Sequence, residues 1–503
     1  MSSATVRRSD ILLAGMLIAG TTLYLCGLPR NLGASDEGAY LYESKMLLEG
    51  RVLYRDVFEI VAPGFYYVTA ALFWLFGATM ATARTETAVL HGLIVAGIYA
   101  TCRVVGVRRT FAAPFALVYP AFIQPAWPYA SPHWVSTGLS VALALILVRR
   151  RGNRALLAGL SAGLLIAVQQ HKGVVFTGGV VLLFLIDHWV TGDRALVSAQ
   201  LARFLLGVML IVVPVTIMLM LTTGPVPAIQ ALVTQPLTNY RTFNRTIWGS
   251  IAFADIQVLP LVYLRLFRDL PLITVLAVAT LLVDGRRRSV PRIHNVLTLS
   301  CLSVLAMLSI ANYPDFIHIA FIAPLFLILL AELVEWLVGR APGLMRRLAS
   351  PAVCLAVLVA VLIQLRANWA EAWNRFPVTL DTAFGRIDLG AADAAAAVQL
   401  RERLGAARAA EFFIYPGYPA LYLITGVRNA TPYQLILPGY SPKAQLDDVI
   451  AILDRQRVPY VLLVSVLTRT DDPVVASVTR AYDYVADFDT SARLVLYRRR
   501  DTR

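Results

Sequence analysis

The chain has 503 residues, of which 58% are hydrophobic and only 15% are charged. This composition excludes a water-soluble domain built around one apolar core and indicates a protein that lies mostly in lipid. Lys and Arg number 45 against 31 Asp and Glu, a formal charge of +14 that raises nucleic acid or an acidic surface as a partner.

Apolar segments follow one another from the N-terminus to about residue 365. The first comes directly after Arg7 and Arg8 and is long enough to cross a bilayer at about 1.5 Å per residue. The alternative is a cleavable signal peptide, but no small-residue cleavage site is evident. We therefore expect eleven membrane-spanning helices: Ile11–Leu28, Arg84–Cys102, Phe111–Trp127, Trp134–Val148, Ala155–Gln169, Val174–Val190, Phe204–Leu221, Pro271–Val283, Val296–Ala311, Phe316–Val338 and Ala352–Leu365.

One further apolar stretch, Pro63–Phe76, is short and rich in aromatic residues, which is typical of a helix in the membrane interface. When it is not counted as a span, every Arg-rich loop falls on the side of the N-terminus, as the positive-inside rule requires. The basic residues of that side are Arg7, Arg8, Arg103, Arg108, Arg109, Arg149, Arg150, Arg151, Arg154, Arg194, Arg203, Arg286, Arg287, Arg288, Arg292, Arg340, Arg346 and Arg347.

The charge excess is explained by this topology. The inner segments hold 18 basic residues against four acids, Asp10, Asp187, Asp193 and Asp284, which accounts for the whole +14. The N-terminus is then cytoplasmic in a bacterial inner membrane. Because the excess marks orientation and no RNP-like, zinc-finger or helix-turn-helix pattern is present, we expect no nucleic acid as a partner.

The predicted number of membrane crossings is odd, which places the C-terminal segment on the side opposite to the N-terminus. Residues 366–503 are then periplasmic, and they mix strand-like and helical patterns, as in a small α/β domain. The predicted strands are Glu411–Tyr415, Pro459–Val464 and Arg493–Tyr497, and the predicted helices are Ala392–Leu404 and Lys443–Arg455. We therefore predict a polytopic α-helical membrane domain over residues 1–365, with a periplasmic loop at residues 29–83, and a C-terminal α/β domain over residues 366–503.

The first periplasmic loop is rich in acids. Its opening, SDEGAYLYESKMLLEG, predicts a surface helix with acids such as Glu43 and Glu49 facing water. Asp36 and Glu37 differ because they lie at the start of this helix, soon after a span. Asp36 could be a helix cap or a functional carboxylate.

Other periplasmic loops bring cations and imidazoles to the same level: His133, His171, Lys172, Arg241, Arg245 and His318. Such groups are costly at membrane depth, so each either snorkels or pairs with a nearby carboxylate, or has a function. Cations neutralise phosphate, and a carboxylate can take a proton from a nucleophile. Because a sugar phosphate leaves as a stable anion, one base and cationic stabilisation suffice for glycosyl transfer.

Several motifs resemble those of the GT-C class of membrane glycosyltransferases, in the branch of protein O-mannosyltransferases and the lipid A aminoarabinose transferase. The matching motifs are S-D-E-G-x-Y at Ser35–Tyr40, G-x-x-x-Y-R-D at Gly50–Asp56, A-P-G-F-Y-Y to W-L-F-G at Ala62–Gly77, A-R-T-E-T at Ala83–Thr87, Lys172, and P-D-x-x-H at Pro314–His318. The resemblance covers roughly Ile11 to Phe321. It implies a polyprenyl-phosphate-linked sugar donor, inversion, and Asp36 as the base.

The chain departs from that pattern where the aminoarabinose transferase has phosphate-contacting cations. Ala39 and Ala62 stand at those positions, and Ser131, Pro132 and His133 stand where relatives often carry a second acid. A divalent metal is therefore doubtful. The candidate residues are Asp36 and Glu37 for catalysis, Lys172, Arg241, Arg245 and His318 for the donor phosphate, and Tyr40, Asp56, His133, His171 and Asp315 for substrate.

Three functions stay open. The first is an inner-membrane glycosyltransferase with a lipid, glycan or protein acceptor, and the second is a lipid or glycan flippase or transporter. The third is a non-catalytic assembly protein. Aromatic residues at Tyr415–Tyr418 and Asn429–Tyr433 fit either core packing with tight turns or a platform for an acceptor sugar.

Overall fold

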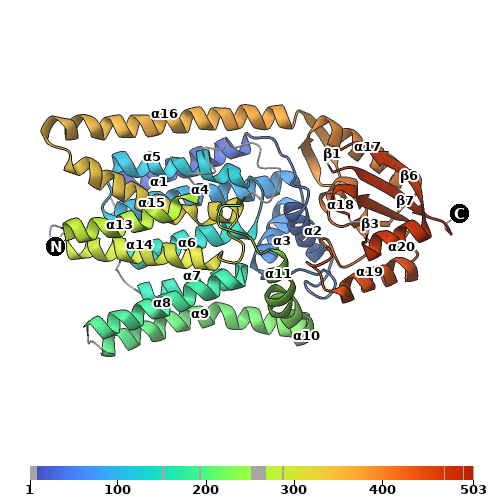
Figure 1. The fold of residues 1–503 in the computed structure, drawn as a ribbon, viewed down its shortest axis with the longest axis horizontal. Helices are drawn as coiled ribbons and strands as arrows, with labels where there is room; N and C mark the ends of the chain where they lie inside the picture. The colour runs from blue at the N-terminus through green and yellow to red at the C-terminus, as the bar shows by residue number, and fades with distance from the viewer. Residues whose placement is uncertain are drawn as a thin grey trace.

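The computed structural model describes residues 8–149, 153–191, 194–250, 268–285, 288–468, 471–490 and 492–501. The molecule is elongated, with a bundle of helices at the end that carries the N-terminus and a domain with a β-sheet at the other end (Figure 1). A loop region with its own helices lies between them. The sequence predicts this architecture, a polytopic helical domain followed by an α/β domain.

Each predicted span coincides with helical structure. Seven helices among the described residues are long and apolar enough to cross a membrane, and the other four predicted spans fall on α5 with η1, α7, α8 and α13. The helices of the bundle are α1 (Arg8–Cys26), α4 (Met80–Val105), α5 (Arg109–Val118), η1 (Tyr119–Ile123), α6 (Pro132–Arg149), α7 (Arg154–Val168), α8 (Gln170–Thr191), α9 (Arg194–Thr222), α13 (Leu270–Asp284), α14 (Val290–Ser309), α15 (Phe316–Arg340) and α16 (Gly343–Arg375).

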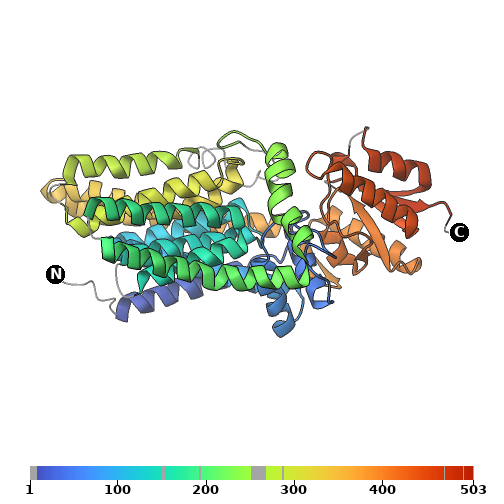
Figure 2. The same cartoon turned by 90° about the horizontal axis from the view of Figure 1, so that it is seen from below.

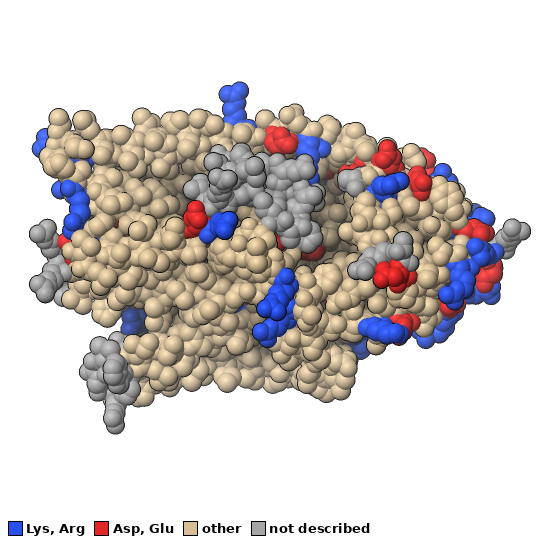
Figure 3. Space-filling view, viewed as in Figure 1, with Lys and Arg blue, Asp and Glu red and all other residues tan. Residues whose placement is uncertain are grey.

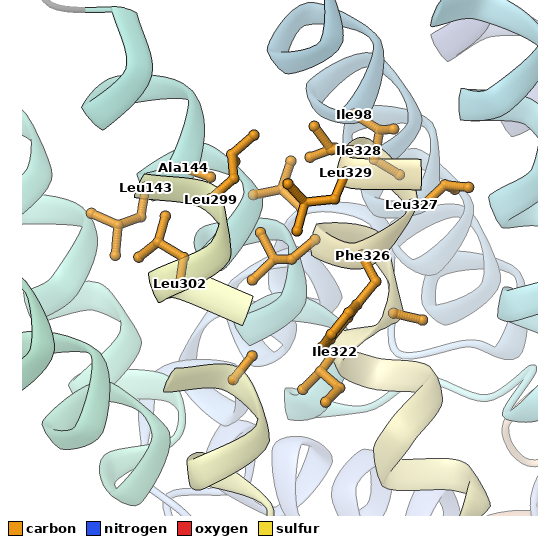
Figure 4. Packing of buried hydrophobic residues seen from close by; sticks show 14 of the residues in the cluster. Ile98, Leu143, Ala144, Leu299, Leu302, Ile322, Phe326, Leu327, Ile328 and Leu329 are labelled. Atoms are coloured by element: carbon orange, nitrogen blue, oxygen red, sulfur yellow. The ribbon is translucent and has the colours of Figure 1, made fainter. Parts of the chain in front are cut away.

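Hydrophobic side chains of α4, α6, α14 and α15 pack together at the centre of the bundle. Figure 4 shows Ile98 of α4, Leu143 of α6, Leu299 of α14 and Phe326 of α15 around a common core, and each is fully buried. α15 contributes most to this core, because nearly all of its residues from Phe316 to Leu329 are buried. It is therefore the central helix of the bundle, and its N-terminal end is fixed in position.

On the face in Figure 3 the helical bundle shows few charged side chains, a few of them at the end that carries the N-terminus, whereas the C-terminal domain shows many. Two buried carboxylates pair with arginines at the end that carries the N-terminus. Asp10 accepts hydrogen bonds from Arg103 and Arg109, and Glu332 accepts from Arg288 and Arg292. Arg7, Arg150, Arg151, Arg286 and Arg287, which also belong to the predicted inner side, lie outside the described residues.

α16 is longer than the predicted last span. It runs from Gly343 to Arg375, so the predicted boundary after Leu365 falls inside a continuous helix. Its last turns are tied to the bundle, because the Tyr24 hydroxyl donates to the Leu365 carbonyl and Asn368 donates to the Ala121 carbonyl, both at 2.8 Å. α16 therefore links the membrane bundle rigidly to the C-terminal domain.

The loop between α1 and α4 contains α2 (Asp36–Leu48) and α3 (Gly64–Phe76). α3 matches the predicted interfacial helix, and its Trp74 and Phe76 are exposed. The prediction that the acids of α2 face water is wrong for Glu43, which is 1% exposed, because α2 is buried on nearly all sides from Glu37 to Ser44. Glu49, at the end of α2, is solvent-accessible and pairs with Lys45.

A second helical segment crosses the same end of the bundle. It runs without interruption through α10 (Pro225–Ile229), η3 (Gln230–Thr234), η4 (Pro236–Tyr240) and α11 (Arg241–Phe243). Figure 2 shows it standing across the end of the bundle, next to the C-terminal domain. Its residues therefore face the space between the two domains.

The C-terminal domain is built on a five-stranded sheet with the order β4-β3-β5-β7-β6. β3 pairs in parallel with β4 and β5, whereas β7 pairs antiparallel with β5 and β6. The strands are β3 (Glu411–Tyr415), β4 (Arg428–Asn429), β5 (Tyr460–Val464), β6 (Tyr482–Phe488) and β7 (Leu494–Arg499), and a separate hairpin pairs β1 (Val378–Thr382) with β2 (Gly385–Leu389). The helices of this domain are α17 (Ala391–Ala406), α18 (Ala420–Thr425), α19 (Lys443–Arg455), the short η7 (Ser465–Leu467) and α20 (Pro473–Ala481). A further short helix, η2 (Gln124–Ala126), follows η1 in the bundle.

The C-terminal domain docks on the first loop through backbone contacts. The Phe58 amide donates to the Pro432 carbonyl at 2.8 Å, and the Met80 amide donates to the Phe384 carbonyl at 2.8 Å. α2 and α18 approach closely at Gly38, where an added Cβ would lie 2.4 Å from the Ala420 nitrogen. The loop and the domain also share one hydrophobic cluster, so they form a single unit above the bundle.

Candidate functional site

A large cavity lies where the bundle, the first loop and the C-terminal domain meet. Its volume is about 1260 Å³, and residues of all three parts line it. A cavity of this size between domains is typical of a site for a small molecule or a lipid head group. Among the predicted site residues, Asp36, Tyr40, His133, His171, Arg241, Asp315 and His318 line it.

The N-terminal ends of four helices meet at this cavity. α2 begins at Asp36, α6 at Pro132, α8 at Gln170 and α15 at Phe316, and residues at each of these ends line the wall. Backbone amides at helix N-termini carry partial positive charge and favour anions. The four helix ends therefore favour an anion in the cavity.

Asp36 occupies the first position of α2, and its carboxylate lines the cavity. The residue at the cap position is Ser35, so the alternative reading of Asp36 as the helix cap does not fit the structure. Burial raises the pKa of Asp36 above its ordinary value, and the positive charge of His318 acts in the opposite direction. A carboxylate with a raised pKa is a stronger base than an exposed one.

His318 is oriented by Asp315, which caps α15. The Asp315 carboxylate accepts from the His318 amide at 2.8 Å and lies 2.6 Å from the ring nitrogen Nδ1. The ring packs edge-on against His133, with 4.9 Å between centroids, and against Tyr313. Since Nδ1 is engaged, Nε2 is the nitrogen of His318 that remains for a ligand.

Lys172 does not line the cavity. Its side chain is 2% exposed, and its ammonium donates to the Ser136 hydroxyl at 3.1 Å. The Ser136 hydroxyl lies 2.7 Å from the amide oxygen of Gln169, whose amide nitrogen is 2.7 Å from His133 Nδ1. Lys172 therefore lies behind the wall and reaches the cavity only through this chain of hydrogen bonds.

Glu37 and Asp56, two further predicted site residues, also lie outside the cavity. The Glu37 carboxylate is fully buried and accepts from Arg84 and from the Gly33 and Ala130 amides. Asp56 pairs with Arg55 at 3.0 Å and accepts from the Val52 amide. Both carboxylates are therefore held by groups of the protein itself.

The two predicted arginines differ in position. Arg241 lines the cavity from the end of the crossing helical segment, whereas Arg245, four residues later, does not. Both side chains are exposed. Arg241 is therefore the arginine of this pair that can reach an anion inside the cavity.

The C-terminal domain forms the roof of the cavity. Tyr418 and Tyr440 line it, and the Tyr440 ring contacts Tyr240 with 5.9 Å between centroids. Tyr415 is instead in the core of the domain, where its hydroxyl donates to Asp472. Core packing thus explains Tyr415, while Tyr418 lines the cavity.

Sequence reasoning missed several residues of the site. Glu59 and Gln170 line the cavity, and the Gln170 amide holds the loop before α3 through the Ile60 carbonyl at 2.7 Å. Glu59 could have been predicted from the sequence, because it is an acidic residue close to the Ala62–Gly77 motif. Within the part of the chain that the structure describes, no three His, Cys, Asp or Glu residues are grouped as ligands of a metal ion.

Comparison with solved structures places the chain among proteins of the GT-C fold. The structure is similar to ArnT from Cupriavidus metallidurans, both bound to undecaprenyl phosphate and in the apo state, with a TM-score of 0.58, 15% identity and 97% of each chain covered. It is also similar to the oligosaccharyltransferase of Archaeoglobus fulgidus in complex with zinc and sulfate, with a TM-score of 0.55 and 12% identity over 96% of this chain and 73% of that one.

No family model matches the sequence, and no curated protein matches it either. The similarity to solved structures extends over nearly the whole chain, which therefore has the GT-C fold of a multi-pass membrane protein.

Proposed function

We propose that the chain is a glycosyltransferase that moves a sugar from a polyprenyl-phosphate donor to an acceptor on the periplasmic side of the bacterial inner membrane. The observation that carries this proposal is Asp36, a carboxylate on the wall of a cavity that imidazoles, Arg241 and the N-terminal ends of four helices also line. The fold supports it, because ArnT with the same fold was crystallised with undecaprenyl phosphate.

In the proposed reaction, a hydroxyl of the acceptor attacks the anomeric carbon of the donor sugar. The bond from that carbon to the phosphate oxygen breaks, and the lipid phosphate leaves with the electron pair. Asp36 accepts the proton of the hydroxyl, and its raised pKa suits it to this role. Attack from the face opposite to the phosphate inverts the configuration at the anomeric carbon.

The leaving phosphate lies, in this proposal, against the helix N-termini, His318 and Arg241. Hydrogen bonds and positive charge there stabilise the negative charge that grows on the phosphate in the transition state. Asp315 is a positioning residue, because it fixes the His318 ring through Nδ1. His133, His171 and Tyr40 line the remaining wall and contact substrate.

The test is turnover by the purified chain in detergent, where no transport across a membrane can occur. Undecaprenyl phosphate carrying glucose, mannose, N-acetylglucosamine or an amino-pentose is incubated with a lipid extract, an oligosaccharide mixture or a protein extract, and released undecaprenyl phosphate is measured by mass spectrometry. We expect release with at least one pair and a loss of about 10²- to 10⁴-fold in D36N.

The matched control is E49Q, because Glu49 is an exposed acid at the end of the same helix. Normal turnover is expected for this variant. Release by folded D36N at the rate of E49Q would overturn Asp36 as the base. Complete absence of release by the wild-type chain, together with movement of the lipid in vesicles, would favour the flippase function instead.

A further inference from the structure

The wall of the cavity next to Asp36 holds a second, separate feature, which is a pair of buried carboxyl groups. Glu43 lies roughly two helical turns after Asp36 on α2, and Glu59 comes from the loop before α3. Both line the cavity, and the negative charge of Glu59 contributes to raising the pKa of the Glu43 carboxyl. Two carboxyl groups that interact in this way are not both readily ionised.

Backbone amides donate hydrogen bonds to the Glu59 carboxyl group, but the Glu43 carboxyl group is less well satisfied. One Glu59 oxygen accepts from the Ile60 amide at 2.6 Å and from the Val61 amide at 3.1 Å. Glu43 is 1% exposed, and its Oε2 has no hydrogen-bond partner among the described residues. A buried carboxyl oxygen without a donor is costly, so its retention on a cavity wall points to a donor supplied by a ligand.

No cation neutralises this pair within the part of the chain that the structure describes, since neither residue belongs to an ion pair there. The Tyr40 side chain, which also lines the cavity, lies between Asp36 and Glu43 along α2. Burial raises the pKa of Glu43 and that of Glu59, and the nearby carboxyls of Glu59 and Asp36 raise the pKa of Glu43 further. This acidic wall contrasts with the wall of His133, His171 and His318.

We propose that Glu43, Glu59 and Tyr40 form the subsite that holds the sugar ring of the donor. The ligand is a glycosyl group with at least two hydrogen-bond donors, either hydroxyl groups or a primary amine, directed at the carboxyl pair. This inference rests on the proposed function and adds to it the source of sugar recognition. The phosphate then faces the imidazole wall, and the anomeric carbon lies between the two walls, beside Asp36.

The distances along α2 agree with this arrangement. Seven residues of an α-helix rise roughly 10 Å, which is enough for a sugar ring between Asp36 at one end and Glu43 at the other. A carboxylate facing vicinal hydroxyls can accept two hydrogen bonds, and hydrogen bonds to a charged group are among the stronger ones. Sugar selectivity is therefore expected to depend on Glu43 and Glu59, whereas binding of the lipid phosphate is not.

The experiment measures binding of two kinds of lipid to the purified full chain by tryptophan fluorescence in detergent. The first kind is bare undecaprenyl phosphate, and the second kind is undecaprenyl phosphate that carries glucose, mannose or an amino-pentose. For the wild-type chain we expect at least one sugar-bearing lipid to bind about 10-fold or more tightly than the bare lipid. In E43A and E59A this advantage disappears, while the affinity for bare undecaprenyl phosphate is unchanged.

E43Q identifies which donor groups the sugar offers, because glutamine still accepts a hydrogen bond but carries no charge. A hydroxyl-bearing sugar keeps part of its advantage in E43Q, whereas an amine-bearing sugar loses nearly all of it. E49Q again serves as the control and should bind every lipid like the wild type. A role of the pair in folding alone would lower the thermal stability of E43A without changing its preference for sugar-bearing lipid.

The outcomes separate the inference from the proposed function. An advantage of the sugar-bearing lipid that persists in both E43A and E59A overturns the subsite, as does a wild-type chain that prefers none of the sugars. In either case, binding of bare undecaprenyl phosphate leaves the proposed function standing. Failure of the wild-type chain to bind any of these lipids contradicts the proposed function itself.

Discussion

Arg84 holds Glu37 in a buried ion pair, with Nη2 of Arg84 2.9 Å from Oε2 of Glu37. The Glu37 side chain is completely buried and the Arg84 side chain is 11% exposed. Asp36, one residue earlier, lines the cavity instead. The two neighbouring acids therefore have different tasks, because Glu37 fixes the start of α2 against α4 and so positions Asp36.

The first prediction concerns the stability that this pair provides. E37Q leaves the Arg84 guanidinium buried without its carboxylate, which is expected to lower the free energy of unfolding by about 3–5 kcal/mol. The measurement is thermal unfolding in detergent. The control is E49Q, whose free energy of unfolding should lie within a few tenths of a kcal/mol of the wild-type value. An unchanged melting temperature for E37Q would contradict the structural role of Glu37.

The second prediction concerns the pH dependence of transfer. Asp36 must be ionised to accept a proton, so the rate falls as the pH drops through its pKa. Because burial raises that pKa, the acid limb lies above the ordinary value of 3.8 for an aspartate. H318Q removes the positive charge that lowers the pKa of Asp36, so the limb moves to higher pH.

The measurement is the pH profile of kcat/KM for the wild type, H318Q and E49Q. E49Q should reproduce the wild-type limb, since Glu49 lies at the exposed end of α2. H318Q should also be slower at every pH, because the neutral glutamine lacks the positive charge that stabilises the leaving phosphate. A limb that stays in place or moves to lower pH in H318Q would refute the electrostatic coupling between the two residues.

The sequence predicted the fold well because its signals are local. Apolar length defined the spans, and a short strand-like run defined β3, whose bounds Glu411–Tyr415 match the prediction. The burial of α2 could not be predicted in this way, because its acids find their partners far along the chain. Arg84 reaches Glu37 from α4, and Glu59 approaches Glu43 from the segment before α3, so α2 carries polar residues without facing water.

Only part of the candidate site could be predicted, because only part of it follows from local sequence signals. Residues at the start of a helix after a loop, such as Asp36 and His318, do line the cavity. Lys172 also lies at the start of a helix after a loop, but the direction of its side chain depends on how α8 packs against α7 and α14. That packing turns the ammonium toward Ser136, which no sequence pattern reveals.

The third prediction separates the two possible roles of Lys172. If it holds the donor phosphate directly, K172M weakens binding of undecaprenyl phosphate. The structure leads us to expect the opposite pattern, with unchanged affinity for this lipid and a kcat about 10-fold lower, because the orientation of His133 is lost. S136A, which interrupts the same chain of hydrogen bonds, should resemble K172M, and a rise in Kd for K172M alone would restore the direct role.

The fourth prediction compares Arg241 with Arg245. Only Arg241 of the two lines the cavity, so R241A is expected to weaken binding of undecaprenyl phosphate about 10-fold, as for one charge-assisted hydrogen bond. R245A should stay within about 2-fold of the wild type, since an exposed charge contributes little. Titration of both variants with the lipid in detergent gives the comparison, and equal effects would show that Arg241 is not a phosphate ligand.

The fifth prediction concerns the contact that seats the roof on the first loop. In G38A the new methyl group would lie 2.4 Å from the Ala420 nitrogen, so α2 and α18 must separate. We expect a destabilisation of about 1–3 kcal/mol and lower transfer activity, because Tyr418 and Tyr440 move away from Asp36 with the domain. The matched control is G405A in α17, where the added methyl group meets no other atom within 4 Å and alanine favours the helix. Thermal unfolding and turnover of the two variants provide the check. If G38A kept both wild-type stability and wild-type turnover while G405A behaved as expected, the close approach of α2 and α18 would not be what places the roof over the cavity.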